Sequence, residues 1–205
     1  MHGQGVAAAG VMNTRSNTTA QWLSRLRQGQ PLYFLSDLCK LSGLGVASMR
    51  RSVQRLVQRG LLRRVGKELY WNTFLPCSIE LLSGALVLPS YVSLESALYH
   101  HGIILQAPQV LTCVTSGPPR RLKTAMGSLL YQHISERYFW GYQQGDGSMA
   151  TAEKAVLDYV YLSLKTGKTF STDEWDWSEI NQPLLLEYSL KFPGTVQRRA
   201  LELTT

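Results

Sequence analysis

The chain has 205 residues, of which 44% are hydrophobic and 17% charged, and its formal net charge is +7 at pH 7. This composition supports a sizeable buried core and excludes a chain that is disordered throughout, and no apolar run approaches the roughly 20 residues of a membrane helix. The charge is uneven: residues 1–75 hold eleven basic and two acidic side chains, net +9, whereas residues 76–205 are net −2. A positive field concentrated in one part of a chain attracts polyanions, of which nucleic acid is the commonest.

The first residues are rich in glycine and alanine and predict a disordered leader over residues 1–17. This segment has neither the basic start nor the long apolar core of a secretory signal. Either Met1 or Met12 can serve as the start of the protein.

The three cysteines Cys39, Cys77 and Cys113 are spaced 38 and 36 residues apart. This spacing is neither a zinc pattern nor a disulfide framework. Three unpaired cysteines are typical of a reducing compartment, so we expect a cytoplasmic protein.

The basic part begins with a predicted helix capped by Thr18 or Thr19, with Trp22 and Leu26 on its apolar face and Gly29 as its end. A short extended segment follows at residues 31–34.

Ser36 is then expected to cap a short helix with Leu38 and Leu41 facing inward, and residues 43–45 (GLG) form a turn. A longer helix is predicted over residues 46–59. Its apolar residues recur at helical spacing and form a single stripe, which comprises Met49, Val53, Leu56 and Val57.

The next segment is predicted to be a hairpin in which residues 61–65 pair with residues 68–71 across a Gly66-Lys67 turn. Helix, turn, helix and hairpin in this order predict a winged helix-turn-helix domain over residues 18–75. The second helix of such a motif enters the DNA major groove.

The predicted DNA-binding residues lie on the helix over residues 46–59 and on the hairpin. Candidates for contacts with base edges are Ser48, Arg51 and Gln54. Candidates for phosphate contacts are Arg50, Arg55, Arg59, Arg63, Arg64 and Lys67. The alternative is that these side chains only solvate one face of a helical domain, or that the motif is a protein interface.

The remaining residues, 76–205, predict a mixed α/β domain with a small sheet and flanking helices, so the overall fold class is α+β. Short strands are expected at residues 110–115, 128–134 and 138–142, and Ser93 is expected to cap a short helix that ends at Gly102. The clearest helix follows Thr151, and a last helix follows Gly194. A basic turn at Arg120, Arg121 and Lys123 is a possible second basic patch for DNA, for a partner protein or for water alone.

We find no pattern in the second part that predicts catalysis, a metal or a cofactor. His100 and His101 are adjacent, so on a helix they point about 100° apart and do not readily bind one metal. Glu153 and Asp158 are five residues apart on one helix and do not form a facing carboxylate pair. The acidic segment is expected to be a solvated loop, and it contains Asp173, Glu174, Asp176 and Glu179.

Several segments of the chain resemble the AbiEi family of antitoxins. They are YVSLESALYHHGI at residues 91–103, a strand with VTS, a basic turn, strands with YQHI and YFWGY, and TAEKAVLDYVYL at residues 151–162. The likeness spans roughly residues 18–190. One departure is Ala152, which stands where the family commonly has proline.

The resemblance implies a bifunctional protein without catalysis of its own. The first domain would bind inverted repeats in its own promoter and repress it, and the second would neutralise a co-encoded AbiEii-type toxin that looks like a nucleotidyltransferase. The family is similar to type IV systems, so contact with the toxin can be weak or indirect. Two alternatives stay open: a regulator whose second domain senses a ligand or partner, and an enzyme acting on nucleic acid.

Overall fold

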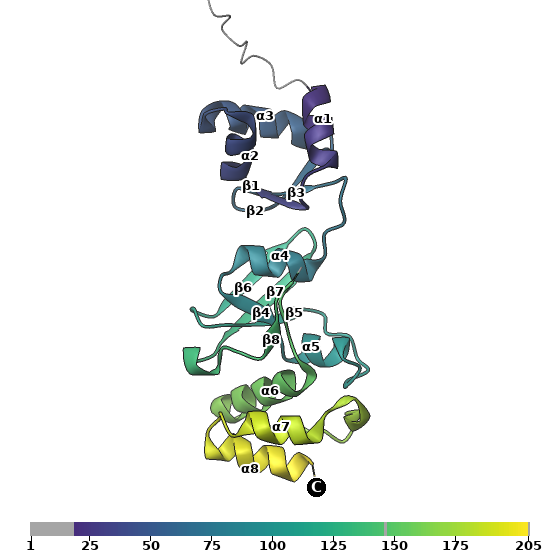
Figure 1. The fold of residues 1–205 in the computed structure, drawn as a ribbon, viewed down its shortest axis with the longest axis vertical. Coiled ribbons are helices and arrows are strands. Elements are labelled where there is room, and N and C mark those ends of the chain that lie inside the picture. Colours follow the sequence, from purple (N-terminus) through teal and green to yellow (C-terminus); the bar gives the residue numbers. More distant parts are fainter. Residues whose placement is uncertain (1–18, 146, 205) are drawn as a thin grey trace, which may run out of the picture.

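The structure is a computed structural model that describes residues 19–145 and 147–204. These residues form eight α-helices and two sheets, which confirms the predicted mixed α+β class. The predicted leader and Thr18 lie outside the described residues. Three tiers follow one another along the long axis: the first six elements, then a sheet with α4 and α5, then the C-terminal helices (Figure 1).

The first tier consists of three helices and a three-stranded antiparallel sheet in the order β1-β3-β2. Its elements are α1 (Thr19–Arg27), β1 (Leu32–Phe34), α2 (Leu35–Ser42), α3 (Val46–Gln58), β2 (Leu62–Gly66) and β3 (Leu69–Asn72). Trp22, Leu38, Met49 and Leu56 are buried in one apolar cluster. The first tier therefore has a core of its own.

The start of α2 differs from the prediction. The helix begins at Leu35, and the side chain of Asp37, not Ser36, accepts a hydrogen bond from the backbone N–H of Phe34 at 2.9 Å. Leu38 is buried as expected, but Leu41 is 48% exposed. An eight-residue helix buries a narrow stripe, and Leu41 lies beyond it.

The turn of the β2–β3 hairpin lies one residue later than predicted. Gly66 still belongs to β2, and the turn is formed by Lys67 and Glu68, whose φ is +55°. Gly66 packs closely on α4: an added Cβ would lie 2.8 Å from Cδ2 of Leu86, so that side chain would have to shift. The pairing also shifts register between Arg64 and Gly66.

Asn72 ties the end of α1 to the sheet. Its buried side-chain amide donates to the carbonyls of Leu26, at 2.7 Å, and Gln30, at 3.1 Å.

Asn72→Ala should lower the free energy of unfolding by about 1–3 kcal/mol, because it leaves buried polar groups without a partner. Urea denaturation would measure this loss, with exposed Gln58→Ala as the control; equal midpoints would contradict the assigned role.

The second tier is built on a mixed six-stranded sheet in the order β6-β7-β5-β4-β9-β8, in which the pairs β4–β9 and β5–β7 are parallel. Its elements are α4 (Ile79–Leu86), β4 (Ser90–Val92), α5 (Glu95–His100), β5 (Leu111–Thr115), β6 (Arg120–Thr124), β7 (Gly127–His133), the 3-10 helix η1 (Glu136–Tyr138), β8 (Tyr142–Gln143) and β9 (Met149–Ala150). The third tier contains α6 (Ala152–Thr166), the 3-10 helix η2 (Trp177–Glu179), α7 (Gln182–Ser189) and α8 (Gly194–Leu203).

The two faces of this sheet belong to different apolar clusters. Val92, Cys113 and Leu129 pack with Ile79 and Leu86 of α4. The other face carries the largest cluster, which joins the sheet to α5, α6, α7 and α8. The sheet is thus enclosed between α4 on one side and the C-terminal helices on the other.

Three predictions for the second part are wrong. The predicted strand over residues 138–142 is absent except for Tyr142, which begins β8. η1 ends at Tyr138, whose ring stacks on Phe192 at a centroid distance of 4.9 Å, so Tyr138 contributes to core packing. Ser93 does not cap α5, which begins after Leu94. The basic turn over residues 120–123 is the edge strand β6, because Leu122 pairs with Leu129 and packs beneath α4.

Helix α4 was not predicted at all. Ser78 caps it, since its hydroxyl accepts from the backbone N–H of Leu81 at 3.1 Å. The sequence of α4 lacks a charged face, so no periodic pattern marks it as a helix. Helix α4 lies between the first tier and the six-stranded sheet (Figure 1).

Candidate nucleic-acid interface and a pocket beneath helix α4

Helix α3 presents a cationic face to solvent. Met49, Val53 and Leu56 are buried, which turns the opposite face outward; Val57, predicted to be buried, is 36% exposed. Of the residues predicted to contact DNA, Ser48 is half-buried. The others are exposed: Arg50, Arg51, Gln54, Arg55 and Arg59 on or directly after α3, and Arg63, Arg64 and Lys67 on the hairpin.

The arginines of α3 have mostly neutral hydrogen-bond partners. Arg51 donates to the Ser48 hydroxyl at 3.5 Å, Arg55 donates to that of Ser52 at 3.2 Å, and Arg59 donates to that of Thr19. Arg51 and Arg55 are also four residues apart, and like charges at this spacing destabilise a helix slightly. The positive charge of α3 is therefore largely uncompensated, and an anionic partner would relieve this repulsion.

A groove of about 630 Å³ separates α3 from the β2–β3 hairpin. Its cations come from both sides: Arg50 from α3, and Arg64 and Lys67 from the hairpin. Gln54 and Gln58 add uncharged hydrogen-bonding groups. We call this surface the α3–hairpin groove. It combines positive charge with a concave shape, and a cleft lined by one sign of charge attracts ions of the opposite sign.

One acid, Glu68, also lines the α3–hairpin groove. Its Oε1 accepts from Nη2 of Arg50 at 2.6 Å. Sequence reasoning assigned Arg50 to phosphate and gave Glu68 no role, because the two residues are 18 positions apart and only the hairpin brings them together.

The second basic group lies apart from α3. Arg120, Arg121 and Lys123 are exposed on β6, at the edge of the second sheet. Charged side chains on an edge strand also protect it from pairing with other chains, so this group has a structural explanation that needs no ligand.

The hairpin packs against α4 through a small apolar cluster. Val65 and Leu69 are buried against Leu82, and Leu86 and Met126 pack around them. The hairpin side of the α3–hairpin groove is therefore in contact with the second tier.

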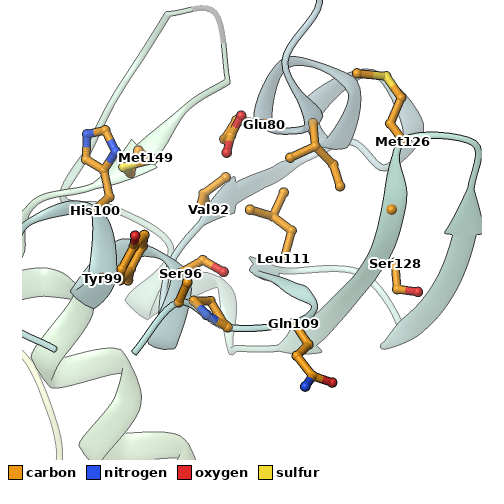
Figure 2. Close-up of a pocket in the computed structure, with 14 residues that line it drawn as sticks. Glu80, Val92, Ser96, Tyr99, His100, Gln109, Leu111, Met126, Ser128 and Met149 are labelled. Atoms are coloured by element: carbon orange, nitrogen blue, oxygen red, sulfur yellow. The ribbon is translucent and has the colours of Figure 1, made fainter. Parts of the chain in front are cut away.

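A pocket of about 320 Å³ lies beside the first turn of α4, where it is lined by Ile79 and Glu80 (Figure 2). Val92 and Leu111 give it an apolar wall, whereas Glu80, Tyr99 and His100 contribute polar groups. Figure 2 shows the Glu80 carboxylate, from α4, on the side of the pocket opposite Tyr99 and Ser96 of α5. An adjoining pocket of about 390 Å³ shares Glu80, His100 and Met149.

The two adjacent histidines have different surroundings. His100 lines both pockets, whereas His101 lines only the second of these two, and its Nε2 lies 2.8 Å from the carbonyl oxygen of Ala150. Among residues 19–145 and 147–204, no three His, Cys, Asp or Glu side chains gather in a way that could hold a metal ion. Within the same ranges, no helix is long and apolar enough to cross a bilayer.

The third tier contains a buried ionic network that sequence reasoning missed. Lys154 and Asp158, both 0% exposed, form an ion pair one turn apart on α6. The other oxygen of Asp158 accepts from the hydroxyls of Tyr91 and Ser93, each at 2.9 Å. The ammonium of Lys154 lies 5.2 Å from the ring centroid of Trp140.

Burial and charge act in opposite directions on this pair. Burial lowers the pKa of Lys154, and the nearby charge of Asp158 acts to raise it. Burial raises the pKa of Asp158, and the nearby charge of Lys154 acts to lower it. Burial also raises the pKa of the Cys113 thiol to about 12, so this cysteine is a poor nucleophile at neutral pH. The charged atoms of Lys154 and Asp158 are buried, and each is bonded to other members of the network.

No protein-family model matches the chain, and no curated protein matches it either.

Proposed function

We propose that residues 18–75 form a winged helix-turn-helix that binds double-stranded DNA, with α3 in the major groove and the β2–β3 hairpin as the wing. The observation that carries this proposal is the exposed cationic face of α3 beside a groove lined by further cations. In this arrangement Ser48, Arg51 and Gln54 reach base edges. Phosphates are bound by Arg50, Arg55, Arg59, Arg63, Arg64 and Lys67.

We further propose that the protein is an antitoxin and autorepressor, on the strength of its resemblance to the AbiEi family. It would act in the cytoplasm, bind inverted repeats in its own promoter as two copies, and counteract a co-encoded nucleotidyltransferase-like toxin through residues 76–205. Co-expression with the neighbouring gene tests this function: the antitoxin should restore growth, and failure to do so would remove the antitoxin claim.

Arg51→Ala should weaken binding to the upstream DNA by about 1–3 kcal/mol and reduce discrimination against a scrambled duplex, because it removes a contact with a base edge. Fluorescence anisotropy with labelled duplexes would measure both affinities. The matched variant Lys67→Ala should weaken both duplexes alike and reduce the salt slope by about one. If the two variants behave identically, the placement of α3 in the major groove is wrong.

The pocket beneath α4 favours a second candidate function, a transcription regulator that senses a small ligand. Its volume falls within the range of small-molecule sites, and α4 both lines the pocket and contacts the hairpin. The low-molecular-mass fraction of a cell extract should then change the affinity for DNA, and Met149→Trp, which narrows both pockets, should abolish the response. If the extract fraction leaves the affinity for DNA unchanged, the result would favour an antitoxin that senses no small ligand.

A further inference from the structure

The ion pair between Arg50 and Glu68 crosses the α3–hairpin groove. The two side chains are 62% and 46% exposed, and the atoms that join them are 2.6 Å apart. An ion pair in contact with solvent contributes little to stability and weakens as salt is added. A phosphate of a bound duplex can therefore displace the carboxylate.

The position of Glu68 does not favour glutamate for structural reasons. Its φ of +55° lies in the left-handed region, where glycine or asparagine is less strained. Its carbonyl accepts from the backbone N–H of Leu35 at 2.8 Å, and any residue could supply this bond. The carboxylate is therefore the part of the residue that needs an explanation.

Glu68 is also the acid that faces the groove. The other acid in the first tier, Asp37, is engaged by the backbone N–H of Phe34 at the start of α2. Among the groove's own lining residues Glu68 faces Arg50, Arg64 and Lys67, and the structure pairs it with Arg50.

We propose that Glu68 is a specificity-determining residue that holds Arg50 away from DNA phosphates until the duplex fits the groove closely. A loosely bound, non-cognate duplex then lacks the phosphate contact of Arg50. A cognate duplex displaces the Glu68 carboxylate and makes this contact. The ion pair between Arg50 and Glu68 therefore weakens non-specific DNA binding more than specific DNA binding. This inference rests on the proposed DNA-binding function.

The test uses Glu68→Gln in the full chain, because glutamine keeps the size and backbone of the residue and removes its charge. Binding to a scrambled duplex should tighten by about three- to tenfold, and its salt slope should steepen by about 0.9, the value of one further phosphate contact. Binding to the upstream duplex should tighten less. In an Arg50→Ala background, Glu68→Gln should have little effect.

Glu187→Gln on α7 is the matched control, since it makes the same change in net charge at an exposed residue of the third tier. An equal gain from Glu187→Gln, or a gain from Glu68→Gln that persists without Arg50, would show a general charge effect and overturn the inference. No gain on the scrambled duplex would overturn it too. In each of these cases wild-type protein still binds DNA, whereas failure of the proposed function would appear as no binding by wild-type protein.

Discussion

Lys154→Met is expected to lower the free energy of unfolding by about 3–5 kcal/mol, because the carboxylate of Asp158 would remain buried without its cation. Asp158 is 0% exposed, and the hydroxyls of Tyr91 and Ser93 cannot neutralise its charge. Urea denaturation followed by circular dichroism would measure the loss. Methionine has a similar length and fills the space among Tyr91, Trp140 and Phe192, so a cavity would contribute little.

Two further variants separate the ionic effect from a general effect of substitution on α6. Lys165→Met changes an exposed lysine of the same helix and should alter stability by less than about 0.5 kcal/mol. Lys154→Met combined with Asp158→Leu buries no charge and should recover part of the loss. A Lys154→Met protein as stable as the wild type would contradict the buried ion pair.

Raising the salt concentration from 50 to 200 mM is expected to weaken DNA binding by about 10³- to 10⁵-fold. Each phosphate contact releases condensed counterions, so the affinity falls as a steep power of the salt concentration. The cations proposed for such contacts are Arg50, Arg55, Arg59, Arg63, Arg64 and Lys67. Anisotropy titrations with one duplex at four salt concentrations would give the slope.

The same titrations decide whether the basic residues of β6 contact DNA. If they do, Arg121→Ala with Lys123→Ala should reduce the slope by about two; if they protect the edge strand, the slope should not change. Circular dichroism at each salt concentration controls for unfolding. A wild-type slope shallower than about −2 would be incompatible with a groove that binds phosphates.

Elements with a strong periodic pattern could be predicted from the sequence. The helices α3 and α6 occupy the expected residues, and Thr151 caps α6 as predicted. Elements defined by long-range pairing could not be predicted. The strand β6 carries three basic residues and is ordered by its pairing with β7, and the apolar helix α4 lacks a polar face that would mark it as a helix.

The candidate site could be predicted in its composition but not in its contacts. The sequence located the arginines, and the burial of Met49, Val53 and Leu56 explains why they face outward. The ion pair of Arg50 with Glu68 depends on the shape of the hairpin turn, which was predicted one residue too early. The Lys154–Asp158 pair has a signal in the sequence, opposite charges four residues apart, but surface helices commonly carry such pairs.

The central claim is that α3 and the β2–β3 hairpin bind a specific duplex. The most direct test is an equilibrium titration of the wild-type protein with two labelled duplexes of equal length and composition: the inverted-repeat DNA upstream of its gene, and a scrambled sequence. At physiological salt the upstream duplex is expected to bind at least about 10³-fold more tightly than the scrambled one. Equal affinity for the two duplexes, or no binding of either at micromolar protein, would contradict it.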